Sequence, residues 1–160
     1  MTLQLFEDTP LSGKSRLRAG APRFIRAMHP KSEIRPTQDA ISRTLRAGWI
    51  GQLKIHGHRA QIHLPPDPKA ALTVYTRQGE RHRVELPEGM ARELRRLFQP
   101  RHGYTVLDCE WLKPEKRLYV FDILREEGEL LQHLTYPERH AKLPRSFISP
   151  FIKVLPILKT

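Results

Sequence analysis

Residues 104–112 (YTVLDCEWL) and 117–124 (RLYVFDIL) are two apolar stretches separated by the four residues Lys-Pro-Glu-Lys. Each stretch has the length of a β-strand, and both are rich in β-branched and aromatic residues. The four residues between them contain a proline and three charged side chains, which are typical of a short turn. The sequence therefore predicts a β-hairpin over residues 104–124.

Side chains along each strand of this hairpin should alternate between two faces. Asp108 and Glu110 then share one face of the first strand, and the apolar positions of that strand occupy the other: Leu107, Cys109 and Trp111. On the second strand, Phe121 and Asp122 are expected on opposite faces. Because buried carboxylates are unfavourable without a partner, Asp108 and Glu110 should face solvent or a cation.

The pattern on either side of the hairpin alternates between strand and helix signals. Residues 49–55, 59–64 and 72–76 are predicted as strands of an antiparallel meander, and residues 37–47, 88–98 and 137–143 as helices. Residues 1–36 read as a basic, loop-rich arm, and the tail from Pro144 is punctuated by prolines. The fold class predicted from the residues is α+β, with antiparallel sheets and flanking helices.

Composition limits the kind of protein and its partners. The 160 residues carry 28 Lys+Arg against 17 Asp+Glu, which gives a formal net charge of +11. A cationic surface favours a polyanion, and nucleic acid is the first expectation. The single Cys109, together with the lack of a signal-like opening or a membrane-length apolar run, predicts a cytoplasmic protein without membrane contact.

The densest group of candidate functional residues begins at Gln52 and ends at Arg59 (QLKIHGHR). If this segment opens as a strand, alternation places Gln52, Lys54 and His56 on one face. A lysine is then held at the end of a strand, followed by Gly57, which permits close approach of the backbone to a ligand or a tight turn. Alone, this pattern is more typical of a solvated strand edge with a hairpin glycine than of a functional site.

Five short motifs, in order along residues 49–143, resemble the nucleotidyltransferase (adenylation) domain of the ATP-dependent DNA ligases, a superfamily that includes RNA ligases and capping enzymes. Residues 54–59 (KIHGHR) resemble its Lys-x-Asp-Gly-x-Arg motif, and residues 107–110 (LDCE) resemble its Asp-Gly-Glu motif. The remaining matches are 75–79 (YTRQG) to a Ser-Arg-x-Gly turn, 119–124 (YVFDIL) to a Val-Phe-Asp strand, and 136–143 to an Arg-containing helix start.

The resemblance implies an ATP-grasp-like architecture over residues 37–160 and a role for each matching residue. Lys54 is the implied catalytic nucleophile, which attacks the α-phosphate of ATP and forms a lysyl-AMP. The implied nucleotide-binding residues are Gln52 at the adenine amino group, Arg59 at the nucleotide or its phosphate, Glu110 at the ribose or a bound Mg²⁺, and Phe121 against the adenine. Arg77 is implied to contact nucleic-acid phosphate. The implied activity is the sealing of nicks in duplex DNA during repair, replication and recombination.

Some positions depart from the family pattern. His56 stands where the motif has Asp, and Cys109 where it has Gly. The family's later Glu-Gly-x-x-x-Lys and Lys-x-Lys strands have no match up to Thr160. The expectation is therefore a domain that lacks its C-terminal part, as a fragment, a degenerate copy, or a subunit completed by another chain or domain.

Three alternatives stay open from the sequence. One is a relative that binds nucleic acid without catalysis, and another is an RNA ligase, because nothing in the residues distinguishes ribose from deoxyribose. The third is a metal site built on His56, His58 and His63, which lacks the four clustered ligands that zinc prefers.

Overall fold

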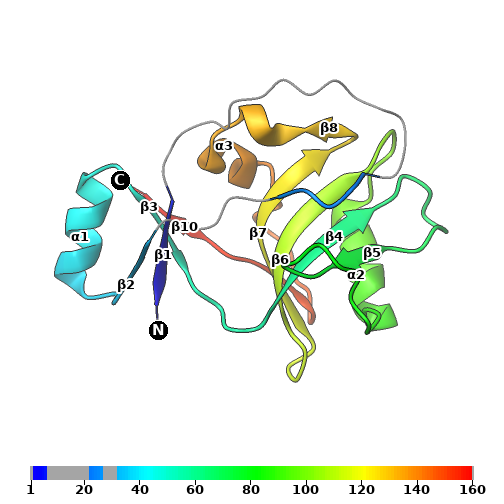
Figure 1. Ribbon diagram of the computed structural model, residues 1–160, viewed down its shortest axis with the longest axis horizontal. Coiled ribbons are helices and arrows are strands. Elements are labelled where there is room, and N and C mark those ends of the chain that lie inside the picture. Colours follow the sequence, from blue (N-terminus) through cyan, green and yellow to red (C-terminus); the bar gives the residue numbers. More distant parts are fainter. Residues whose placement is uncertain (1, 7–21, 27–31, 160) are drawn as a thin grey trace.

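The computed structural model describes residues 2–6, 22–26 and 32–159. It is a mixed α/β structure built on two antiparallel, curled sheets with few helices (Figure 1). The α+β class predicted from the sequence is confirmed at this level. We call the two sheets the large sheet and the small sheet.

The large sheet has the strand order β5-β4-β6-β7-β8, and β9 pairs in parallel with β7. Its strands are β4 (His58–Leu64), β5 (Thr73–Tyr75), β6 (Thr105–Leu112), β7 (Arg117–Glu126), β8 (Glu129–Leu130) and β9 (Ile152–Val154). The predicted hairpin is confirmed as β6 and β7, which meet antiparallel along their length. In the turn between them, Lys116 has a positive φ of 50°.

One face of the large sheet forms the main hydrophobic core. Alternation puts Ile62 of β4, Cys109 of β6 and Val120 of β7 on this face, and all three side chains are fully buried. The helix α2 (Glu88–Phe98) covers it with the buried side chains of Met90 and Leu94, as the spacing of its apolar residues predicts. The helix has the bounds expected from the sequence.

The small sheet has the order β10-β3-β1-β2, with strands β1 (Leu3–Phe6), β2 (Ser32–Ile34), β3 (Ile50–Leu53) and β10 (Ile157–Leu158). The prediction that residues 49–55 join a meander with 59–64 is wrong. Strand β3 pairs with β1 and β10, whereas β4 pairs with β5 and β6. The chain therefore leaves one sheet at Leu53 and enters the other at His58, as Figure 1 shows.

Both chain ends of the described structure contribute strands that the sequence pattern did not reveal. The arm predicted as loop over residues 1–36 supplies β1 and β2, and the proline-punctuated tail supplies β9 and β10. Residues 7–21 and 27–31 of that arm lie outside the described residues. Strands of two to four residues are too short to show a period of two, and their partners are distant in the chain.

The other helices begin at side-chain caps. Helix α1 (Gln38–Arg46) starts after Thr37, whose side chain accepts a hydrogen bond from the amide of Ala40. Helix α3 (Tyr136–Ala141) follows the 3-10 turn η1 (Leu131–His133) and starts with a capping box between Thr135 and Glu138. None of the helices in the described part of the chain has the length and apolar character needed to cross a bilayer.

Two irregularities in the β6–β7 ladder change which side chains share a face. Asp108 pairs with Asp122, but the next residue of β6, Cys109, pairs with Val120, so Phe121 is an extra residue. Such a β-bulge interrupts the alternation of the strand. The expectation that Phe121 and Asp122 face opposite sides is therefore wrong, because both lie on the face that carries Asp108. A second shift follows at Val106/Leu107.

Candidate functional site

The face of the large sheet opposite the main core is polar, and two ion pairs lie within it. Arg59 of β4 donates to Asp108 of β6 through Nε, at 2.6 Å, and through Nη2. Arg139 of α3 donates to Asp122 of β7 through Nε at 2.9 Å and Nη2 at 2.8 Å. Asp108, on the first strand of the hairpin, thus faces a cation, as the sequence predicts.

Arg59 also covers the ring of Phe121. Its guanidinium carbon lies 4.9 Å from the ring centroid, which is a cation–π distance. Burial lowers the pKa of Arg59, but the nearby Asp108 and Glu110 outweigh that effect and the pKa is raised, so the side chain stays charged. Among the described residues, none accepts a hydrogen bond from Nη1, so that nitrogen remains available to a ligand.

Glu110 is tied to the turn that follows Lys54. Its Oε1 accepts the amide of Gly57 at 2.9 Å, and burial raises the pKa of its carboxyl group against the opposing effects of that hydrogen bond and of Arg59. At Gly57 there is no room for a side chain, because a Cβ there would lie 2.7 Å from the carbonyl oxygen of Trp111. The glycine is thus required by the close approach of two backbone segments.

Lys54 follows directly after β3, and both its backbone amide and its side-chain amine are held by other residues. Its amide donates to the carbonyl of Thr2 at 2.8 Å, and its Nζ donates to Glu33 on β2 in an ion pair. The side chain of Lys54 is 24% exposed, so its amine is partly sheltered but still reachable. Glu33 comes from the segment predicted as loop, and no sequence signal marked it as a partner of the lysine.

A cleft of about 460 Å³ between the two sheets brings four of the predicted site residues together: Lys54, Arg59, Arg77 and Glu110. Arg77 is exposed in the turn after β5, where Gly79 adopts a φ of +84° that favours glycine. These residues come from the end of β3, from β4, from the turn after β5 and from β6. Three of the five motifs that carry the resemblance therefore contribute residues to the same cleft.

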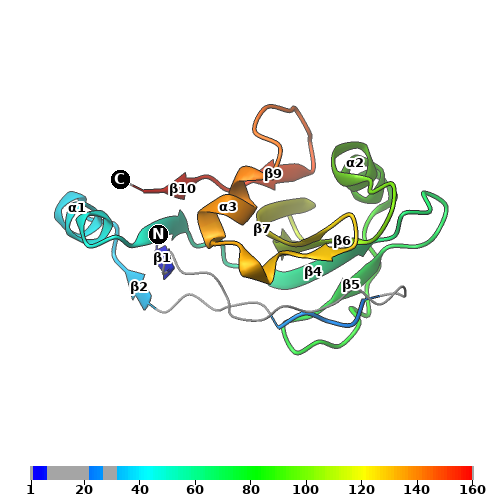
Figure 2. The ribbon, with the colours of Figure 1, turned by 90° about the horizontal axis from the view of Figure 1, so that it is seen from above.

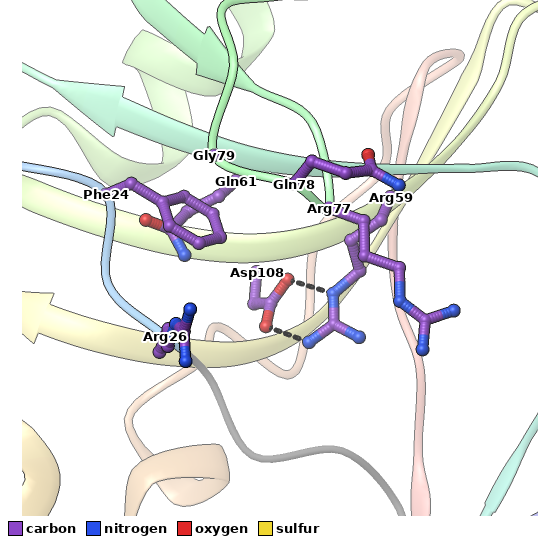
Figure 3. Close-up of a pocket in the computed structure, with 8 residues that line it drawn as sticks. All are labelled: Phe24, Arg26, Arg59, Gln61, Arg77, Gln78, Gly79 and Asp108. Carbon is purple, nitrogen blue, oxygen red and sulfur yellow. Dashed lines mark hydrogen bonds and ion pairs between the residues drawn. The ribbon is translucent and has the colours of Figure 1, made fainter.

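A second cleft, of about 620 Å³, adjoins the first and shares Arg59, Arg77 and Gln78 with it. Figure 3 shows the Arg59–Asp108 ion pair at its floor, with Phe24 and Arg26 on the opposite side. Phe24 and Arg26 belong to residues 22–26, which cross the polar face of the large sheet on the side away from α2 (Figure 2).

Two of the predicted nucleotide-binding residues are not brought to either cleft. Gln52 is 1% exposed, and its side chain donates to the carbonyl of Leu155 at 3.3 Å, so it is a buried residue of the small sheet. Phe121 is half-buried beneath Arg59, and a base could stack on that face of the ring only after Arg59 moved. His56, at the position of the motif's Asp, is exposed.

The histidines that suggested a metal are spread apart. His56 and His58 are exposed, whereas His63 is buried on β4, where burial lowers its pKa to about 4. Within residues 2–6, 22–26 and 32–159, no three His, Cys, Asp or Glu side chains gather as potential metal ligands.

Sequence reasoning missed the residues that support the site from outside the motifs. Glu33, Phe24 and Arg26 lie in the segment that showed no period, so nothing in the sequence pointed to them. Arg139 is different, because it lies within the 136–143 match, where the sequence predicts a helix. A capping box between Thr135 and Glu138 fixes where that helix begins. Comparison with protein-family models and with the curated proteins finds no match for this chain.

Proposed function

We propose that this protein is an ATP-dependent nucleotidyltransferase of the DNA ligase type, in which Lys54 carries AMP. The observation that supports this most directly is the convergence of Lys54, Arg59, Arg77 and Glu110 on one cleft from three separate stretches of the chain. The resemblance assigns these four residues to one reaction, and the fold gives them one surface.

In the first step, the neutral amine of Lys54 attacks the α-phosphorus of ATP. A P–N bond forms, the P–O bond to the leaving pyrophosphate breaks, and the nitrogen releases a proton to solvent. Arg59 and Arg77 supply the fixed positive charge that stabilises the developing charge on the phosphates. Because lysine attacks only when neutral, the ion pair with Glu33 must open before the reaction.

In the later steps, the stored AMP passes to nucleic acid. An oxygen of a 5′-phosphate attacks the phosphorus of lysyl-AMP, which restores the lysine amine and leaves AMP on the strand end. A 3′-hydroxyl then attacks the 5′-phosphate, the strands are joined, and AMP departs. The net charge of +11 suits a protein that holds a nicked DNA backbone during these steps.

The donor set of the cleft is compatible with Mg²⁺ bound together with ATP. Magnesium usually takes one or two carboxylates and completes its shell with substrate phosphates and water. Glu110 offers such a carboxylate, since only one of its oxygens accepts a hydrogen bond from the described residues. The ion would neutralise charge on the phosphates.

The test is covalent labelling of the protein with α-³²P-ATP and Mg²⁺. The expected result is label that survives denaturation, is lost in acid as a phosphoramidate, and is absent from Lys54→Ala. Lys69→Ala, which changes an exposed lysine outside both clefts, is the matched control and should label normally. Label that persists in Lys54→Ala, or no label on the wild type, contradicts the proposal.

Addition of a nicked duplex to the labelled protein extends the test to the substrate. We expect a 5′-phosphorylated DNA nick to remove the label and to become sealed. A nicked RNA duplex in competition distinguishes a DNA ligase from an RNA ligase, because only the 2′-hydroxyl differs at the site.

The rival function is nucleic-acid binding without catalysis. It is favoured by the contacts that occupy the proposed nucleophile and the proposed stacking ring, since Lys54 is paired with Glu33 and Phe121 is covered by Arg59. This rival predicts salt-sensitive binding of DNA and no covalent AMP. The labelling experiment separates the two functions.

A further inference from the structure

Tyr136, at the start of α3, is a buried residue with contacts to both sheets. Its ring packs with Ile50 of β3 and Ile157 of β10 on the small sheet, and the residue is 1% exposed. Its hydroxyl reaches the large sheet, where it donates to the carbonyl of Phe121 on β7 at 2.9 Å. Two views agree that α3 lies between the small sheet and β7 (Figure 1, Figure 2). One side chain thus joins the two sheets.

The carbonyl that Tyr136 holds belongs to the β-bulge of β7. Phe121 is the extra residue of the β6–β7 ladder, because its neighbours Val120 and Asp122 pair with successive residues of β6. An extra residue is left out of the ladder, so its backbone groups need other partners. Tyr136 supplies one of them. Burial raises the pKa of the Tyr136 hydroxyl well above its usual value, so the proton that it donates is retained.

Gln52 connects the same hydroxyl to β3. The side chains of Gln52 and Tyr136 are hydrogen-bonded, and because the Tyr136 proton goes to Phe121, the amide of Gln52 is the donor. The same amide nitrogen donates to the carbonyl of Leu155 at 3.3 Å, and the Leu155 amide donates to Val120 of β7 at 2.8 Å. Gln52 is 1% exposed, so its hydrogen bonds are shielded from water. We call Tyr136 and Gln52 the inter-sheet clamp.

The inter-sheet clamp ties together the two walls of the cleft that holds Lys54. Gln52 stands two residues before Lys54 on the small sheet, and Phe121 lies beneath Arg59 on the large sheet. The linker from β3 to β4 forms no helix or strand, so the covalent connection does not fix the angle between the sheets by itself. The separation of Lys54 from Arg59 therefore depends on contacts such as those of the clamp.

We propose that Tyr136 is a positioning residue of the reaction: together with Gln52 it holds the two sheets at the separation at which the amine of Lys54 reaches a phosphate bound on the large sheet. This role rests on the proposed function, because it takes Lys54 as the nucleophile. A misplacement of about 1 Å that arises far from the reacting atoms can slow a reaction by about 100-fold. Loss of the clamp should lower the rate of the chemical step and leave the affinity for ATP unchanged, because the phosphate-binding arginines stay on the large sheet.

The test is the single-turnover rate of lysyl-AMP formation in Tyr136→Phe, which keeps the ring and removes only the hydroxyl. Rapid mixing with α-³²P-ATP and Mg²⁺ at a series of ATP concentrations gives the rate constant at saturation, the ATP concentration at half-saturation and the fraction of protein that becomes labelled. We expect the rate constant to fall by about 10- to 100-fold with the half-saturating concentration unchanged. A purely structural role would lower the labelled fraction through unfolding and leave the rate constant as in the wild type.

Tyr104→Phe is the matched control, because it makes the same chemical change in a half-buried tyrosine outside both clefts. It should keep the rate constant of the wild type. An unchanged rate constant in Tyr136→Phe overturns the inference, whether or not the half-saturating ATP concentration rises.

Gln52→Leu tests the other half of the clamp and separates positioning from base recognition. The substitution removes the amide and fills its place with an apolar side chain of similar size. We expect the same fall in the rate constant and an unchanged ratio of ATP to ITP use, since ITP lacks the amino group of adenine. A loss of discrimination between ATP and ITP in Gln52→Leu would show that Gln52 reads the base, and it would overturn the inference.

A distance measurement tests the clamp without any reaction. Nitroxide labels on Arg43→Cys in α1, which contacts β3, and on Arg92→Cys in α2 report the separation of the two sheets, while the buried Cys109 should stay unlabelled. The distance distribution should be narrow when Tyr136 is present and broader in Tyr136→Phe. An equally narrow distribution in Tyr136→Phe refutes the clamp alone, whereas a wild type that forms no lysyl-AMP refutes the transferase function.

Discussion

Replacement of Arg139 by methionine tests whether the buried polar network holds the large sheet to α3. Arg139 is 3% exposed and donates to Asp122 at 2.8, 2.9 and 3.2 Å and to the carbonyl of Leu134 at 2.9 Å. Asp122 lies opposite Asp108 in the β6–β7 register. Without Arg139, two neighbouring buried carboxylates would share the single cation of Arg59.

The expected loss of stability is large. Removal of one partner from a buried ion pair destabilises a protein by about 3–5 kcal/mol, because the remaining charge is left without compensation. The free energy of unfolding of a typical domain is about 5–15 kcal/mol, so Arg139→Met should be close to the limit of folding at neutral pH.

The loss should also depend on pH. Burial, reinforced by Asp108, raises the pKa of Asp122 to about 6, and Arg139 opposes this rise. Because the folded pKa lies above the unfolded value, the folded state binds more protons in this range, and the free energy of unfolding falls as pH increases from about 4 to about 6. In Arg139→Met the opposing cation is gone, the pKa rises further, and the fall continues to higher pH. The deficit relative to wild type should therefore be larger at pH 8 than at pH 5.

Urea unfolding followed by tryptophan fluorescence at pH 5 and pH 8 measures both effects. Arg43→Met is the control, because Arg43 and its partner Asp39 are 69% and 75% exposed and their pair should contribute nothing measurable. A deficit below about 1 kcal/mol at pH 8, or a deficit that is larger at pH 5, would refute the reasoning about the buried network.

Three further predictions concern the polar face and its supports. Cys109 is fully buried, and burial raises the pKa of its thiol well above the usual value. A thiol reagent should therefore react with it only at urea concentrations that unfold the protein, and rapid reaction with the native protein would contradict this packing. Gly57→Ala should lower the melting temperature and weaken covalent AMP formation, because the new Cβ would lie 2.7 Å from the carbonyl oxygen of Trp111. An unchanged melting curve would argue against that close approach. Arg59→Lys should lower the free energy of unfolding, measured by urea titration, by about 1–3 kcal/mol, because lysine cannot make the two-point contact with Asp108. Full retention of stability would show that the second contact is dispensable.

The local pattern of the sequence was sufficient for the longer elements. Helix α2 was predicted at its observed bounds, and the β6–β7 hairpin and the helix expected over 37–47, which is α1, were also confirmed. In these elements the signal is local, because a stripe of apolar residues, a turn or a capping side chain lies within a few residues of the structure that it specifies.

The candidate site was predictable in part. The motifs pointed to Lys54, Arg59, Arg77 and Glu110, which the fold brings to one cleft. They also pointed to Gln52, which lies outside both clefts, because its burial depends on the pairing of β3 with β10, more than a hundred residues away. The position of Phe121 was also missed, since a β-bulge is not visible in the alternation of apolar residues.

The sequence by itself determined that this chain is basic, that it mixes helices with antiparallel strands, and that a lysine stands at the end of a strand before Gly57. Only the tertiary structure decided that β3 and β4 belong to different sheets, that Glu33 pairs with Lys54, and that residues 22–26 form a wall of the larger cleft. The physical reason is that composition and periodicity are properties of neighbouring residues. Strand partners and buried ion pairs arise between distant residues, and they are selected by the packing of the whole chain.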